Sequence, residues 1–257
     1  EQIMQDDLKA QHRSIIDRCV QAVYRPYIAS GYKGDAPTLT NLQAEIKRQP
    51  EPEAQELALA AELFISGSLS IFAQKTNVDQ NNRLTSYNIL DLGEQLLPMG
   101  MLVILESIYN RVIQNWRAGR RTWVFVDEFS IFFRYPFATN FFLRMWKQVR
   151  KRAGYMTGIT QNVGEMLTSK DACWMLANSE FLIMLSQSAS DRAALAELLN
   201  ISDTQLSYVE NADPGCGLMK FGGAFIPFVN SFPEDTELYK LMTTKPADRE
   251  QVKPHGV

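Results

Sequence analysis

Asp127 and Glu128 form a pair of adjacent carboxylates directly after a run of apolar, β-favouring residues, 122–126. An Asp at the end of a strand can hold Mg²⁺ through its water shell, and a neighbouring Glu can orient and deprotonate an attacking water. The pair therefore suggests magnesium-dependent nucleotide hydrolysis. A plain alternative exists, because Asp also ends strands and opens turns in proteins without such an activity.

The element that must position this pair is the run 122–126, which follows Arg120 and Arg121. A continuous apolar run with β-branched and aromatic residues predicts a strand buried on both faces, as in a parallel sheet. Ligands gather at the carboxyl ends of such strands. Asp127 and Glu128 would then stand in the Walker B position of a RecA-like nucleotidase.

Gln161 follows the next expected strand, residues 155–160. In RecA-like nucleotidases the corresponding strand lies between the Walker B strand and the phosphate-loop strand, so Gln161 is expected to face the γ-phosphate. Its amide can donate to a phosphoryl oxygen or hold the attacking water. The alternative is a loop amide that caps a helix at 163–167, and both roles can coexist.

A basic run, residues 147–152, lies at the end of an expected helix, 137–152. Such runs are usually solvated and favoured by the helix dipole. A sharper hypothesis is that Arg150 or its neighbour Lys151 reaches a nucleotide in an adjoining subunit as an arginine finger. A third is contact with DNA phosphates, although the run has no interleaved aromatic residues.

The chain pattern predicts an α/β fold with a mostly parallel sheet flanked by helices. Residues 1–82 read as an all-helical subdomain, 83–245 as the α/β core, and 246–257 as a loose tail. The expected helices and strands, with a C-terminal β-hairpin at 218–229, are 3–29, 39–46, 53–64, 84–90 (strand), 94–116, 122–126 (strand), 137–152, 155–160 (strand) and 181–185 (strand).

Composition points to an ordinary globular protein: 257 residues, 46% hydrophobic and 21% charged, with a formal net charge of −3. This balance argues against coating of nucleic acid through bulk charge, although a local basic patch stays possible. Three scattered cysteines suggest reduced thiols, and two histidines give no basis for a zinc site. We expect no signal peptide or membrane span, because the apolar stretch 96–109 falls short of the ~20 residues required.

Beyond these motifs, several segments of the chain resemble the C-terminal RecA-like domain of the large ATPases of conjugation and type IV secretion machines, the TraC, TrsE and CagE type. The resemblance runs from about Asp17 to Lys245, and its most specific part is the Thr-Gln-Asn block after Asp-Glu-Phe. The segments that carry it are 120–129, 146–151, 157–163, 177–179, Asp191 with Leu195, 215–218, 226–228 and 235–239.

The resemblance implies an ATPase that powers DNA transfer, secretion or pilus assembly at the cytoplasmic face of the cell membrane. It implies ATP and Mg²⁺ as ligands, with Asp127 at the metal, Glu128 activating water and Gln161 sensing the γ-phosphate. Arg150, with Lys151 beside it, would act in trans within a hexamer. Other copies of the chain and other secretion components at the membrane are the implied partners, with DNA as a possible one.

One departure from this family is that no G-x-x-x-x-G-K-[ST] motif occurs, and the segment 31–34 does not replace it. Because backbone amides and a lysine that hold the β- and γ-phosphates are missing, we expect a fragment that neither binds ATP tightly nor hydrolyses it. We also expect a slot with unpaired backbone groups beside the strand 155–160, and we expect another segment or chain, such as a neighbouring copy, to cover it. Two alternatives stay open: a non-catalytic docking module of the secretion channel, and a DNA-pumping coupling ATPase.

Overall fold

The computed structural model describes residues 8–78, 82–161, 163–230 and 232–243. The chain divides into two compact units, Glu1–Gln114 and Asn115–Val257. This division falls later than the limit expected between residues 82 and 83, because most of a long helix is grouped with the first unit. The tail expected at 246–257 lies outside the described residues.

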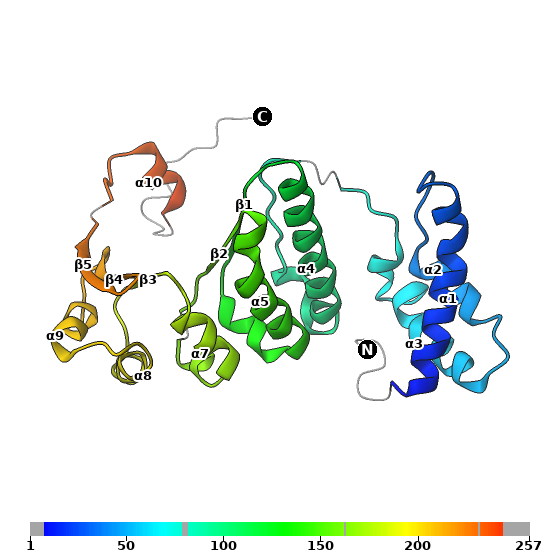
Figure 1. Ribbon diagram of the computed structural model, residues 1–257, viewed down its shortest axis with the longest axis horizontal. Coiled ribbons are helices and arrows are strands. Elements are labelled where there is room, and N and C mark those ends of the chain that lie inside the picture. Colours follow the sequence, from blue (N-terminus) through cyan, green and yellow to red (C-terminus); the bar gives the residue numbers. More distant parts are fainter. Residues whose placement is uncertain (1–7, 79–81, 162, 231, 244–257) are drawn as a thin grey trace. The chain divides into compact units, whose positions relative to one another are not determined.

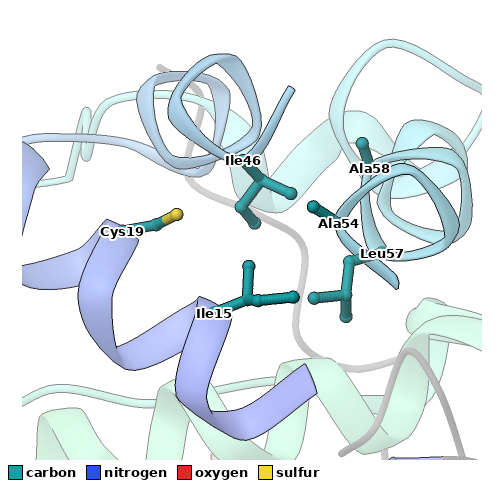
Figure 2. Close-up of a cluster of buried hydrophobic side chains, with 6 residues drawn as sticks. All are labelled: Ile15, Cys19, Ile46, Ala54, Leu57 and Ala58. Carbon is teal, nitrogen blue, oxygen red and sulfur yellow. The ribbon is translucent and has the colours of Figure 1, made fainter. Parts of the chain in front are cut away.

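The first unit begins with α1 (Ala10–Ala29), α2 (Leu39–Ile46) and α3 (Pro52–Ile65), which confirms the helical reading of this region. Apolar side chains at helical spacing meet between the three helices. Figure 2 shows this core, formed by Ile15, Cys19, Ile46, Ala54, Leu57 and Ala58. Thr38 caps α2 in a capping box with Asn41.

Two polar contacts fasten α1 to α3. Arg18 pairs with Glu51, the N-cap residue of α3, at 2.7 Å, and buried His12 contacts Glu56 at 3.3 Å. The hydrogen bond from Arg18 lowers the pKa of the Glu51 carboxyl, and the same bond raises the pKa of Arg18. Burial raises the pKa of the Cys19 thiol in the adjacent core.

The remainder of this unit holds the short 3₁₀ helices η2 (Ser70–Ala73) and η3 (Leu90–Leu92), followed by α4 (Gly93–Arg117). The strand expected at 84–90 is wrong. This segment is irregular and ends in η3, and it carries polar residues that bond locally: the Tyr87 hydroxyl lies 2.9 Å from Ser107 Oγ, and Asn88 donates to Asp91 at 3.2 Å. No described strand pairs with it.

Helix α4 extends the helix expected at 94–116 by one residue at each end. It has 25 residues and a mean hydropathy of 1.4 over its most apolar window, and among the described helices it is the one long and apolar enough to cross a membrane. The expectation of no span counted only the stretch 96–109. The core helix of a soluble protein meets the same criterion.

The second unit alternates strands with helices and confirms the α/β fold class (Figure 1). Its C-terminal β-hairpin, β4 with β5, is also confirmed. After α4 the elements are β1 (Thr122–Val126), η4 (Phe129–Arg134), α5 (Pro136–Gln148), η5 (Val149–Arg152), β2 (Gly154–Gly158), α6 (Val163–Leu167), α7 (Lys170–Ala177), β3 (Phe181–Met184), α8 (Ala189–Leu199), α9 (Asp203–Leu206), η6 (Ser207–Val209), β4 (Cys216–Phe221), β5 (Ala224–Val229) and α10 (Glu237–Met242).

The strands form two sheets. β1 and β2 pair in parallel, whereas β3, β4 and β5 form an antiparallel sheet in that order. The strand at 181–184 therefore pairs with the hairpin and does not join β2. Among the described residues, the edge of β2 away from β1 has no strand partner, and this is where the open slot was expected.

One expectation about β1 is wrong. Val124 and Val126 are buried, but Trp123 and Phe125 are 60% and 66% exposed. Side chains alternate across a strand, so β1 is covered on one face and open on the other. A continuous apolar run cannot reveal this, because its residue types are the same on both faces.

Candidate active site

The carboxylate pair occupies a tight turn at the end of β1. Glu128 has a left-handed backbone conformation, with φ of 48° and ψ of 46°. Asp127 Oδ1 accepts a hydrogen bond from the Glu128 backbone N–H at 3.0 Å. Non-glycine residues rarely adopt this conformation, and where they do it often belongs to a functional site. The turn stops the strand and starts η4, so the two carboxylates stand at the carboxyl end of the sheet.

Backbone hydrogen bonds hold this turn against the end of β2. The Ile159 N–H donates to the Val126 carbonyl, and the Phe129 N–H donates to the Ile159 carbonyl, both at 2.8 Å. Val126, just before the acid pair, and Phe129, just after it, are thus both hydrogen-bonded to Ile159. As a result, the positions of Asp127 and Glu128 depend on β2 as well as on β1.

The ring of Phe129, the residue after this turn, is packed in the core and holds the turn in place. It is 2% exposed, stacks on Trp146 at 5.6 Å between ring centroids and meets Phe142 edge-on at 4.9 Å. A Cβ added at Gly158 would lie 2.5 Å from Phe129 Cδ1. A real side chain at position 158 would therefore displace the ring, and with it the turn that carries Glu128.

Gln161 joins this site as its sequence position predicted. Its side-chain Nε2 donates to Glu128 Oε1 at 2.7 Å. The amide therefore contacts the carboxylate directly. Its neighbour Asn162 lies outside the described residues.

The chemistry of these groups fits a hydrated divalent cation. Asp127 and Gln161 are exposed and Glu128 is half-buried, so solvent reaches the two carboxylates, and hard oxygen ligands of this kind suit Mg²⁺. Arg134 follows in η4, but its guanidinium pairs with Glu165 at 2.7 Å. That hydrogen bond raises the pKa of Arg134 and commits its charge to α6.

Arg150 and Lys151 lie elsewhere. Both belong to η5, which precedes β2, whereas Glu128 and Gln161 follow the ends of β1 and β2. The register pairs Thr122 with Gly154 and Val126 with Gly158, so a whole strand length, ~13–16 Å at ~3.3 Å per residue, separates the two ends. These two cations therefore do not share a site with the acid pair of their own chain.

Two residues that position the site were missed from the sequence, Phe129 and Gly158. A signal for one of them was present: a glycine inside a strand pattern often marks the close approach of another group. For Phe129 there was none, because an apolar residue after the acid pair gives no indication of which strand it packs against.

The second unit is an α/β fold that carries an acid pair and an amide at the carboxyl end of its two parallel strands. Among solved structures, VirB4 of Thermoanaerobacter pseudethanolicus matches 91% of this chain and 67% of its own chain, with a TM-score of 0.73 and 22% identity. The resemblance seen in the sequence is thereby confirmed at the level of the fold.

A second solved structure, the plasmid coupling protein TrwB in complex with the non-hydrolysable GTP analogue GDPNP, covers 87% of this chain and 65% of its own at 15% identity and a TM-score of 0.48. No family model matches the sequence. No curated protein matches it either.

Proposed function

We propose that this chain is the C-terminal part of an ATPase that powers conjugative DNA transfer, type IV secretion or pilus assembly. The observation that carries the proposal is the contact between Gln161 and Glu128 at 2.7 Å, beside Asp127 at the carboxyl end of β1. Three side chains that would handle metal, water and phosphate are thus gathered at one edge. The VirB4 fold supports the same reading.

In this proposal each side chain has one task. Asp127 would hold hydrated Mg²⁺, which when bound would supply positive charge against the phosphates. Glu128 accepts a proton from water through its carboxylate. The Gln161 side-chain N–H donates a hydrogen bond either to Glu128, as here, or to a phosphoryl oxygen. Its hydrogen-bond partner would therefore change when a γ-phosphate is present.

The phosphate-binding half of the site is not supplied by this sequence, which has no G-x-x-x-x-G-K-[ST] motif. Triphosphate affinity in such sites comes mainly from backbone amides and a lysine that hold the phosphates. Alone, the chain is expected to bind ATP weakly and to leave it intact. A phosphate-loop strand placed along the open edge of β2 would bring these groups next to Gln161.

The remaining assignments concern assembly. Arg150, with Lys151 beside it, would complete the nucleotide site of a neighbouring copy within a hexamer, because both lie far from the acid pair of their own chain. The assembly would sit peripherally at the cytoplasmic face of the cell membrane and contact other components of the secretion machine.

The test is to fuse a strand with a G-x-x-x-x-G-K-[ST] loop ahead of Glu1 and to measure ATP hydrolysis. We expect the fused protein to hydrolyse ATP, and Glu128→Gln to reduce kcat by roughly 10²–10⁴-fold, since a positioned general base contributes about that much. Glu197→Gln, an exposed acid on α8, is the matched control and should change nothing. No hydrolysis would favour the non-catalytic docking module, and hydrolysis that is indifferent to Glu128→Gln would contradict the role assigned to Glu128.

A further inference from the structure

The open face of the parallel sheet carries a stack of aromatic side chains. Trp123 and Tyr155 are cross-strand partners whose rings stack at 4.3 Å with an interplanar angle of 19°. Phe125 continues the row, 6.4 Å from Trp123 and tilted by 12°. The three side chains are 60%, 40% and 66% exposed. Exposed apolar surface of this kind usually marks a binding site.

Basic residues gather at one end of this face. Arg120 and Arg121 precede β1, and Arg150, Lys151 and Arg152 precede β2. Because the strands are parallel, both runs come to the same end, where the Thr122 N–H donates to the Ala153 carbonyl at 3.1 Å.

The charges of this cluster are largely uncompensated. Arg120, Arg121, Arg150 and Lys151 are exposed, and none of them pairs with a carboxylate in the part of the chain that the structure describes. The cluster thus concentrates positive charge in a chain whose formal net charge is −3.

We propose that this face binds single-stranded nucleic acid, with bases stacked on Trp123 and Tyr155 and phosphates held by Arg120 and Arg121 at the basic end. Aromatic platforms beside a cationic groove bind single strands with little sequence preference, because every base has a π-face. The basic run alone lacked aromatic residues, but the two strands supply them. The basic end of this surface lies a whole strand length from Asp127 and Glu128, so the inference goes beyond nucleotide hydrolysis.

Charge complementarity favours this occupant over a second copy of the chain. A symmetric dimer through the same face would bring two basic clusters towards each other, and like charges across an interface are unfavourable. A polyanion gains from every one of these cations. A duplex would satisfy the cations but could not stack its paired bases on the rings, so a single strand is preferred.

The experiment measures fluorescence anisotropy of a labelled oligothymidylate of ~20 nucleotides titrated with the full chain at several salt concentrations. We expect binding that weakens with salt, with a slope of log K against log salt of roughly −0.7 per phosphate contacted. The equivalent duplex should bind more weakly at every salt concentration.

Variants then separate stacking from charge. Trp123→Ala should weaken binding by roughly 5- to 100-fold with an unchanged salt slope, as expected for the loss of one stacked base. Trp123→Phe should retain most of the affinity. Replacing Arg120 and Arg121 by Ala should weaken binding and reduce the slope by about 1.4. The matched control is Arg25→Ala with Lys33→Ala, an equal loss of exposed charge in the helical unit.

Circular dichroism melts establish that each variant is folded. If Trp123→Ala does not fold, Trp123→Phe, which keeps an aromatic ring, still tests the proposal. The proposal is overturned if no salt-sensitive binding occurs, or if Trp123→Ala and the Arg120–Arg121 variant bind as the wild type does. It is equally overturned if sedimentation finds a concentration-dependent dimer that Trp123→Ala dissociates, since a second copy would then cover the face.

Discussion

Gln161 Nε2 lies 2.7 Å from Glu128 Oε1, although the two residues are 33 positions apart in the chain. Parallel pairing of β1 with β2 brings them together, because both follow the carboxyl ends of their strands. A hydrogen bond to a charged carboxylate is stronger than one between neutral groups. The contact therefore orients Glu128, the proposed base. Glu128 keeps this hydrogen bond until another acceptor competes for the Gln161 amide.

Removing this amide should impair the fused, hydrolysing protein. We expect Gln161→Ala to lower kcat by roughly tenfold or more, since a lost charge-assisted bond is worth about 1.5–3 kcal/mol. A double-mutant cycle with Glu128→Gln checks the reason: the two losses should be far from additive, because the residues act through one contact. Additive losses would mean that they act independently.

Gly158 is expected to be intolerant of any side chain. Gly158→Ala should destabilise the second unit by about 1–3 kcal/mol, because its Cβ would overlap a Phe129 ring that is packed on all sides. Urea denaturation measures this loss. Gly223→Ala is the control, since nothing lies within 4 Å of a Cβ there. Equal stability of the two variants would show that the ring can move freely.

A partial rescue of Gly158→Ala would identify the cause of its defect. Adding Phe129→Leu to Gly158→Ala should recover part of the lost stability, because the branched side chain leaves room for the new methyl group. A double variant that is less stable than either single variant would contradict a clash at this position.

Acid should weaken the helical unit through the pair Arg18–Glu51. The folded pKa of Glu51 is lowered, so its contribution to stability is present above the carboxyl's ordinary pKa and is lost as the pH falls through the folded value. Arg18→Met should therefore lower stability at neutral pH and make it less dependent on pH on the acid side. Far-ultraviolet circular dichroism during acid titration follows this change, with Arg25→Met as a control at an exposed arginine of α1.

The sequence predicted the fold class, the hairpin and the edge that holds Asp127, Glu128 and Gln161, because each depends on local pattern and on strand ends. It did not predict which strands pair. The segment 84–90 has strand-like residues but pairs with no described strand. β3 pairs with β4, and the local sequence pattern of β3 does not indicate which strand will be its partner. The exposed face of β1 escaped notice for a related reason, since burial depends on what covers a residue.

The relation of Arg150 and Lys151 to the site also depends on topology. Their residue types suit a nucleotide, but the parallel register places them at the amino ends of the strands. Their action in trans is still a prediction. At Gly158 the sequence did contain a signal, because a glycine within a strand often marks the close approach of another group. Only the structure shows that this group is the ring of Phe129.

The central claim is that Asp127, Glu128 and Gln161 face one divalent cation, and paramagnetic broadening by Mn²⁺ in place of Mg²⁺ tests it most directly on the chain as it stands. At low Mn²⁺ the amide signals of these three residues should broaden together, those of Arg150 and Lys151 should stay sharp, and Asp127→Asn should abolish the effect. Broadening centred elsewhere, or none at all, would contradict the account.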